Sequence, residues 1–450
     1  MALNQKRFVK LSIILLVNLL AILFISYSKW IFVDNRYSLL QQQLEQPKAR
    51  SNSSSNTKIK SILFWNGPRR SEMTIFGTGH DAFVQQECPV SDCEIVNSPY
   101  QYPYRPLSSF DAVIFNFNDE FWLTKRPHFQ RQPHQRFIFF TIEPPPSNEP
   151  MNVTGYTNYF NWTMTYRLDS DVPFPYGRIR PKRSAPTTSE EIQARIKETH
   201  SKLFNCDNDI NSRTNCESRK NKTLVAAMIS HCSTDGRREH YIKRLKKHVK
   251  VDVYGFCDEE DLELGSGLRC QPHELLISTP ECYDMLESKY KFYLSFENAI
   301  CSDYVTEKFF HIMGRRNIVP IVYGGADYAQ LAPEHSYIDA LEYEPEQLAQ
   351  YLKMLDANDT LYNEYLWWKN DYVVESDLRQ MVRHGFCDLC RKLHQDQGQV
   401  KYYPSLLPKW HPGRCFRPHY KSNRSTSRNK GLTKKAALHE RLSWTLGESL

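Results

Sequence analysis

The chain has 450 residues, enough for two ordinary domains with accessory segments. Its composition is that of a globular protein, with 40% hydrophobic, 13% aromatic and 24% charged residues. The net charge of +7 is mild and is concentrated partly in the basic C-terminal run KSNRSTSRNKGLTKK, so it gives no argument for nucleic-acid binding.

The N-terminal segment predicts a membrane anchor. Basic residues within the first ten positions precede an apolar, uncharged run over residues 11–27. About 20 apolar residues cross a bilayer, and leading positive charge keeps that side in the cytosol. A cleavable signal peptide is the alternative, but it requires a shorter apolar core and small residues at the cut site. Tyr27, Lys29 and Trp30 stand there instead, so we expect an uncleaved anchor with everything downstream in the secretory lumen.

Two further features agree with a luminal location. The 12 cysteines all follow residue 80, which suits an oxidising compartment. Asn-x-Ser/Thr triplets, each a weak signal alone, are candidate sites of N-glycosylation. These triplets begin at Asn52, Asn152, Asn161, Asn221, Asn358 and Asn423.

A stem and a first α/β domain are predicted next. Residues 34–58 are rich in Gln and Ser and have little to bury, which is typical of a flexible spacer. Beyond them, short apolar runs separated by polar, Pro-rich loops indicate buried strands. These runs are KSILFW at 60–65, FDAVIFNF at 110–117 and RFIFFTIE at 136–143.

A second series of strands follows a polar linker, in which EEIQARIKETHSKLF predicts a surface helix. Segments with helical spacing, such as GRREHYIKRLKKH and YVTEKFFHIMGRR, separate these strands. Strands that alternate with helices predict a doubly wound parallel sheet. The expected strands are LVAAMIS at 224–230, VKVDVYG at 249–255, KFYLSFE at 291–297 and NIVPIVYGG at 317–325.

Cationic side chains follow two strands of this second series. In FYLSFENAICSDYVTEKFF (292–310), Lys308 stands near a helix start, where it opposes the helix dipole unless an anion binds there. The sequence Asp235-Gly236-Arg237-Arg238 follows the strand at 224–230, and an arginine so placed can clamp phosphate bidentately. Each alone is more often a solvated surface group, but the two together favour a pyrophosphate ligand.

Carboxylates suggest two further kinds of site. Glu143 ends a very apolar strand and precedes three prolines that stiffen the loop, which suits a general base, although a strand-end carboxylate facing water is the alternative. Asp169-Ser170-Asp171 has the Asp-x-Asp spacing that can hold a divalent metal. Such matches arise by chance, as at residues 207–209, and cationic side chains could neutralise a leaving group without a metal.

Four cysteines form two local pairs. Cys88 and Cys93 lie in one loop, and Cys387-x-x-Cys390 lies near the C-terminus. Zinc binding and a redox centre are alternatives, but structural disulfides are favoured in the lumen. If the two pairs bond across, they tie the first domain to the returning end of the chain.

The motif FYLSFEN followed by DYVTEKFF resembles the donor-site signature of the α1,3-fucosyltransferases, Golgi enzymes that use GDP-fucose. The stretch FNWTMTYRLDSDVPFPYG (160–177) is similar to that family's first-domain motif, and IVPIVYGGADY to the strand and loop after its donor helix. The Cys387-x-x-Cys390 pair stands where the family has C-terminal cysteines. The resemblance covers roughly residues 59–415.

The resemblance implies an α/β fold of the GT-B class, with two Rossmann-like doubly wound domains facing across a cleft. It implies no active-site metal or other cofactor, so that Asp169 and Asp171 become structural. By resemblance Glu143 is the general base, and the donor contacts are Arg238 and Lys308 at the pyrophosphate, Glu307 at the ribose, and Asn298 and Tyr304.

The resemblance also implies a location and a reaction. We expect a single-pass type II protein of the Golgi membrane that moves fucose with inversion from GDP-fucose to a GlcNAc hydroxyl of a glycoprotein glycan, either the N-glycan core or an outer arm of LacNAc or LacdiNAc type. No nucleic-acid partner is expected, and the stem or membrane segment offers a route to homo-oligomers. The alternatives are a metal-dependent Asp-x-Asp glycosyltransferase and a catalytically silent glycan-binding relative.

The sequence departs from the family pattern in its basic tail and in additional cysteines, a set more like that of invertebrate members. These cysteines are Cys206, Cys216, Cys257, Cys270, Cys282 and Cys301. The predicted organisation is a cytosolic tail (1–10), anchor (11–33), stem (34–58), acceptor-side domain (59–180), linker (181–223), GDP-fucose-binding domain (224–385), C-terminal cysteine-containing segment packing on the first domain (386–415) and basic, disordered tail (416–450).

Overall fold

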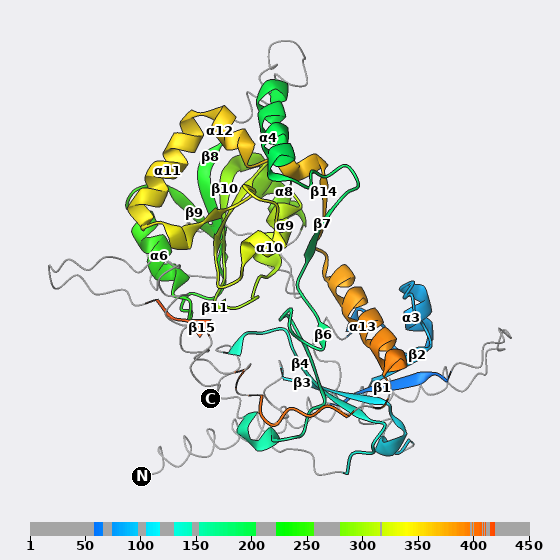
Figure 1. Ribbon diagram of the computed structural model, residues 1–450. Helices are drawn as coiled ribbons and strands as arrows, with labels where there is room; N and C mark the ends of the chain where they lie inside the picture. The colour runs from blue at the N-terminus through cyan, green and yellow to red at the C-terminus, as the bar shows by residue number, and fades with distance from the viewer. Residues whose placement is uncertain are drawn as a thin grey trace, which may run out of the picture. The chain divides into compact units, whose positions relative to one another are not determined.

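The computed structural model (Figure 1) places its described residues in one compact unit that begins at Lys58. The predicted anchor at 11–33 lies outside these residues, as do nearly all of the stem and most of the basic tail. Within the described part, no helix is both long and apolar enough to cross a membrane. The structure describes residues 58–65, 74–97, 105–117, 130–145, 153–203, 222–255, 280–315, 317–396, 398, 400–406, 408, 410 and 415–418.

The first sheet is parallel, with strand order β2-β1-β3-β4-β5-β6. Every residue of β3 and β4 is buried, as expected where a parallel strand is covered on both faces and reads as a continuous apolar run. The strands are β1 (Lys60–Phe64), β2 (Cys93–Asn97), β3 (Ala112–Asn116), β4 (Arg136–Thr141), β5 (Trp162–Thr165) and β6 (Val172–Pro173).

The second sheet is also parallel, with strand order β13-β12-β10-β8-β9. Its central strand β10 is buried along its whole length, so the polar residues that follow it emerge at the carboxyl edge between β8 and β12. The strands are β8 (Thr223–Met228), β9 (Val251–Tyr254), β10 (Tyr290–Phe296), β12 (Val319–Tyr323) and β13 (Ile338–Asp339).

Helices cover both faces of the second sheet (Figure 1). Helices α6 (Arg238–Leu245), α11 (Pro345–Ala357) and α12 (Asp359–Glu364) pack on one face through their apolar residues. Helices α8 (Pro280–Lys289) and α9 (Glu307–Met313) pack on the other. The remaining helical elements are α3 (Asp81–Gln85), α4 (Ser189–Leu203), α10 (Tyr328–Leu331), α13 (Leu378–Gln395) and the 3-10 turns η2 (Leu107–Ser109), η5 (Val153–Tyr156), η6 (Ala340–Glu342) and η7 (Trp367–Asn370).

The two faces of the first sheet are covered by different parts of the chain. On one face, side chains such as Ile62 and Phe140 pack against α3 and α13. On the other, an aromatic cluster that includes Phe139 and Phe160 also contains Tyr304 from the region after β10 and Trp410 from the C-terminal segment. Segments far apart in sequence therefore complete this core.

Two antiparallel pairs join distant segments. β7 (Arg178–Pro181) pairs with β14 (Tyr372–Glu375), and β11 (Ile300–Cys301) pairs with β15 (Cys415–Phe416). Each pair lies outside the two main sheets.

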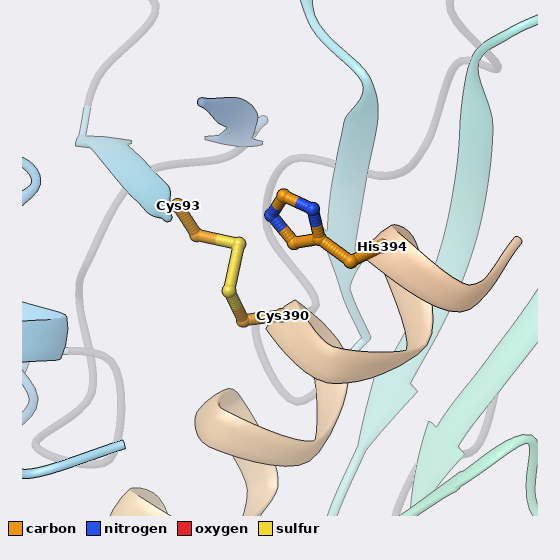
Figure 2. A group of neighbouring side chains, drawn as sticks. All are labelled: Cys93, Cys390 and His394. Atoms are coloured by element: carbon orange, nitrogen blue, oxygen red, sulfur yellow. A yellow bond between two sulfur atoms is a disulfide. The ribbon is translucent and has the colours of Figure 1, made fainter. Parts of the chain in front are cut away.

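The four cysteines of the two local pairs form disulfides, as predicted, and the structure decides the pairing that the sequence had left open. Cys88 bonds to Cys387 and Cys93 bonds to Cys390, which attaches α13 to the first sheet. His394 lies next to the second disulfide, as Figure 2 shows, so three potential metal ligands are close together. The two sulfur atoms are joined to each other, however, and the His394 Nε2 atom lies 2.8 Å from the carbonyl oxygen of Asp92. In this structure the group is a disulfide with a hydrogen-bonded histidine.

The predicted strands and helices are largely confirmed. All seven predicted strands and the surface helix of the linker are present, with end points that differ by a few residues. Strands β2 and β5 were missed because polar residues interrupt CEIVN and WTMT, which therefore lack the continuous apolar run of the predicted strands. Helix α13 begins at Leu378, inside the range predicted for the second domain, although its apolar residues pack on the first sheet.

One glycosylation candidate is wrong. Asn161 is 0% exposed, its side-chain oxygen accepts from the Phe137 N–H, and its side-chain nitrogen donates to the carbonyl of Lys401. A glycan cannot be attached to an amide that is enclosed in the core. Asn358 is exposed and stays a candidate. The triplets at Asn52, Asn152, Asn221 and Asn423 lie outside the described residues.

Candidate functional site

The carboxyl end of β10 leads into a closed loop, residues 297–306, called the 297–306 loop below. Glu297 is 0% exposed, and both oxygen atoms of its carboxylate accept hydrogen bonds from Thr306. The Thr306 N–H lies 2.8 Å from Oε1, and the Thr306 hydroxyl lies 2.9 Å from Oε2. These bonds join the two ends of the loop, and α9 begins at the next residue.

Lys308 lies beside this closure with two carboxylates around it. Its Nζ atom is 2.8 Å from Glu307 and 3.7 Å from Glu297, and it also donates to the Thr306 hydroxyl at 2.9 Å. The side chain is 21% exposed, so the ammonium is partly open to a ligand. The donor contact predicted at Lys308 stays a prediction. Helix α9, which begins at Glu307, has seven residues.

The protonation of these groups follows from burial and from their mutual charges. Burial raises the pKa of Glu297, an effect that Lys308 opposes. Burial also opposes the charge on Lys308, but Glu307 and Glu297 outweigh it and raise the pKa of the ammonium. Burial acts against the charge on Glu307 too, and Lys308 lowers the pKa of that carboxyl. Lys308 and Glu307 thus carry opposite charges at neutral pH.

Arg238, the first residue of α6, lies almost fully inside the protein at 1% exposure. Its guanidinium donates to the carbonyl oxygens of Phe296, at 2.7 Å, and His231, at 3.4 Å. Among the described residues its Nε atom has no hydrogen-bond partner. A buried guanidinium held only by carbonyl groups retains capacity to bind an anion.

Gly236 brings the turn after β8 against the 297–306 loop. Its N–H donates to the carbonyl oxygen of Asn298 at 2.7 Å, and a Cβ atom at this position would lie 3.0 Å from that oxygen. Tyr323, at the end of β12, donates its hydroxyl to the Gly236 carbonyl at 2.9 Å. The ends of β8, β10 and β12 therefore converge, as expected at the carboxyl edge of a parallel sheet. The side-chain oxygen of Asn298 is buried there without a partner in the described part of the chain.

The first sheet contributes Glu143 to the same place. The Tyr304 hydroxyl donates to Oε2 of Glu143 at 3.4 Å, and burial raises the pKa of Tyr304 well above its usual value, so this phenol keeps its proton. The Tyr304 ring packs on Tyr166 with ring centroids 5.0 Å apart. Tyr176 donates to the carbonyl of Ile142 at 3.0 Å, next to Glu143. The polar end of β4 thus meets the 297–306 loop.

All six residues predicted for the site lie in this region. Arg238 and Lys308 influence each other electrostatically, and Tyr304 links the group to Glu143. Three further residues of this region, Glu297, Thr306 and Gly236, had no predicted role. The position of Glu297 at a strand end, directly before Asn298, could have suggested a role in the site. Its complete burial could not be predicted from the sequence.

Both carboxylates of the Asp-x-Asp sequence have hydrogen-bond or ion-pair partners within the protein. Asp171 accepts from the Thr163 N–H, Tyr403 and Lys401, at 2.9, 2.7 and 2.8 Å. Asp169 pairs with Arg167 at 2.9 Å. Asp171 therefore joins β5 to the C-terminal segment, whereas the Asp169 pair lies within the turn that follows β5.

Lys369 caps the carboxyl end of α9. Its ammonium donates to the carbonyl oxygens of Met313, at 2.8 Å, and Arg315, and it lies 4.2 Å from the ring centroid of Trp368. A cation at this end complements the helix dipole. Burial lowers the pKa of Lys369 to about 7.

This lowered pKa predicts a pH dependence of stability. In the unfolded chain the lysine pKa is about 10.4, so between pH 7 and 10 the unfolded state binds more protons and the free energy of unfolding should rise with pH. Lys369→Met removes this titration. The difference in unfolding free energy between wild type and variant, measured by urea unfolding, should increase with pH across that window. The exposed Lys353 of α11 supplies the control: for Lys353→Met the difference should stay flat. If the difference for Lys369→Met is also independent of pH, the lowered pKa of Lys369 is wrong.

Comparison with known proteins identifies the family. The family model described as "Fucosyltransferase, N-terminal" matches residues 57–177, and "Glycosyltransferase family 10 (fucosyltransferase) C-term" matches residues 218–410. The chain is 34% identical to alpha-(1,3)-fucosyltransferase C of Drosophila melanogaster, over 84% of this chain and 82% of the relative.

Two other relatives have names that indicate different products. Glycoprotein 3-alpha-L-fucosyltransferase A of Drosophila melanogaster is 30% identical over 84% of this chain and 65% of its own length. The bovine (Bos taurus) 3-galactosyl-N-acetylglucosaminide 4-alpha-L-fucosyltransferase is 31% identical over 68% of this chain and 71% of its own length. With both family models matched in order along the chain, the protein belongs to glycosyltransferase family 10, the fucosyltransferases.

Proposed function

We propose that this chain transfers L-fucose from GDP-β-L-fucose to a hydroxyl of GlcNAc and forms an α1,3 linkage. The observation that carries the proposal is that buried Arg238 and partly exposed Lys308, at strand ends of the second sheet, lie near Glu143 of the first sheet, to which Tyr304 connects them. Membership of the fucosyltransferase family and the 34% identity to an α-(1,3)-fucosyltransferase support it.

The donor diphosphate binds at Arg238 and Lys308 in this proposal. Two buried polar atoms in the same region, Nε of Arg238 and the side-chain oxygen of Asn298, have no partner among the described residues. Buried polar groups in proteins are nearly always hydrogen-bonded, so atoms of this kind mark places that a ligand or water completes. Glu307, next to Lys308 at the start of α9, is placed to accept from a ribose hydroxyl.

The reaction is a single displacement with inversion. Glu143 takes the proton of the GlcNAc hydroxyl, and the oxygen attacks C1 of fucose. The bond from C1 to the β-phosphate oxygen breaks, and its electron pair leaves with GDP. Arg238 and Lys308 stabilise the negative charge that develops on the departing diphosphate. The Tyr304 hydroxyl, which keeps its proton, fixes the orientation of the Glu143 carboxylate.

The fold assignment and the location form part of the same proposal. Two parallel sheets that meet at their carboxyl edges support the GT-B class. Disulfides at Cys88, Cys93 and Cys301 support a luminal catalytic part, because disulfides persist in oxidising compartments. The apolar run at 11–27 would then anchor the chain in the Golgi membrane in type II orientation.

Replacement of the base should separate transfer from donor binding. We expect Glu143→Gln to lower kcat by about 10²- to 10⁴-fold, the usual contribution of general acid–base catalysis. The dissociation constant of GDP, measured by calorimetry, should change by less than about twofold because Gln can still accept from Tyr304. Glu346→Gln, at an exposed position of α11, is the matched control and should leave both values unchanged. A fully active Glu143→Gln enzyme would remove Glu143 as the base.

Replacement of the partly exposed cation should act on the donor. Lys308→Ala removes a charge-assisted contact, worth roughly 1.5–3 kcal/mol, so GDP affinity should fall about 10- to 100-fold. Lys353→Ala serves as the control for loss of one positive charge. Donor kinetics and GDP affinity equal to those of the wild type would reject the role of Lys308.

The acceptor class follows from product analysis. The full-length enzyme should be incubated with GDP-fucose and a panel of glycans that carry either the N-glycan core or LacNAc and LacdiNAc outer arms. Fucose on the innermost GlcNAc identifies a core enzyme, and fucose on an outer GlcNAc identifies an outer-arm enzyme. Absence of transfer to every GlcNAc acceptor would contradict the proposed function.

A further inference from the structure

The last described residues of the chain are bonded to the 297–306 loop. Strand β15 runs antiparallel to β11, with Cys415 opposite Cys301. The two cysteines form a disulfide across a sequence separation of 114 residues, and their exposures are 2% for Cys301 and 8% for Cys415. A bond between distant segments therefore lies inside the loop that carries the donor contacts.

Cys301 is the first residue of the turn that delivers Tyr304. The Tyr304 N–H donates to the Cys301 carbonyl at 3.3 Å, and Asp303 within the turn has a φ of 62°, a left-handed conformation that costs energy outside glycine. On the other side, a Cβ atom on Gly325 would lie 2.6 Å from the Cys301 carbonyl oxygen, so the backbone after β12 closely approaches the turn. The turn is thus held between that backbone and the disulfide.

The same returning part of the chain has an upstream anchor. Trp410 packs on Phe139 of β4 and on Tyr166, with ring centroids 5.4 and 5.5 Å apart. Tyr166 in turn packs on Tyr304. Trp410 therefore contacts the strand that leads to Glu143 as well as the ring that supports Tyr304.

We propose that this returning segment, comprising described residues 400–406, 410 and 415–418, is a positioning element of the donor site. Through the Cys301–Cys415 disulfide it holds the 297–306 loop in the shape that presents Asn298 and Tyr304 to GDP-fucose. The inference rests on the proposed function. Cys301 and Cys415 act through the loop, and without their bond a smaller fraction of the protein has the site assembled, which weakens apparent affinity by that fraction.

The test is a comparison of two disulfide deletions in the full-length enzyme. Cys301→Ala/Cys415→Ala should raise the KM for GDP-fucose and the dissociation constant of GDP at least fivefold. The KM for the glycan acceptor should change much less than the KM for GDP-fucose, because in the proposed function the acceptor meets the loop only indirectly, through Glu143 and its hydrogen bond with Tyr304. A merely structural role would lower the amount of folded protein without this split between the two substrates.

The control deletes Cys93–Cys390, which closes a loop of similar kind with a sequence separation of 297 residues. Because Cys88–Cys387 still closes nearly the same loop, this control should lower the melting temperature less than the Cys301–Cys415 deletion does, so donor KM is compared on folded protein at a temperature below both melting transitions. Cys93→Ala/Cys390→Ala should leave the donor KM unchanged. Equal donor KM values in both deletion variants would overturn the proposal.

A second variant decides the matter if the double deletion does not fold. Phe416→Pro keeps the disulfide but weakens β15, because proline has no N–H to donate. It should raise the donor KM in the same direction by a smaller factor, and an unchanged value would count against the proposal. If the wild-type enzyme itself transfers no fucose from GDP-fucose, the proposed function fails. A wild type that transfers fucose, with variants of normal donor KM, refutes only the positioning role.

Discussion

The buried contact between Glu297 and Thr306 is the constraint on which the rest of the site depends. It joins the end of β10 to the residue before α9, so a loop of ten residues begins and ends at one point. Without it, Lys308 and Tyr304 would be free to move relative to the strand. The Glu297 carboxylate is fully buried, where a polar group without hydrogen-bond partners would be costly. Its hydrogen bonds with Thr306 meet that requirement, so they stabilise the closed loop.

The core of the first sheet explains how two sheets can share one site. One face is covered by α13, which the Cys88–Cys387 and Cys93–Cys390 bonds attach. The other face is completed by aromatic residues, by the 297–306 loop and by the returning C-terminal segment. Tyr304 belongs both to this core and to the candidate site. The packing of the first sheet therefore also determines the position of Tyr304 in the site. Apolar burial on that face therefore contributes to the placement of a polar contact with Glu143.

Sequence patterns predicted most of the framework because apolar runs between polar loops are strong signals in parallel sheets. KSILFW and KFYLSFE were identified from their residues alone, whereas β2 and β5 contain polar residues that break the apolar run. A motif carries no information about burial, which is why the triplet at Asn161 misled. The candidate donor-binding residues Arg238 and Lys308 could be identified from the sequence because each follows a predicted strand. The Cys301–Cys415 bond was not readable, since the spacing of cysteines leaves many pairings open.

In the proposed function, the arrangement of charges at Lys308, Glu307 and Glu297 lowers the cost of binding a diphosphate. In the free protein Lys308 already contacts Glu307 and lies 3.7 Å from Glu297, so its ammonium is not fully hydrated before a donor arrives. Binding then exchanges one anionic partner for another, and the large penalty of moving a cation out of water is already part of the folded state. Burial raises the pKa of Glu297, and Lys308 opposes this effect. Arg238 adds positive charge, and its guanidinium donates to two carbonyl groups. The site is thus preorganised for negative charge on the leaving group, which is the form in which electrostatic stabilisation is most effective in catalysis.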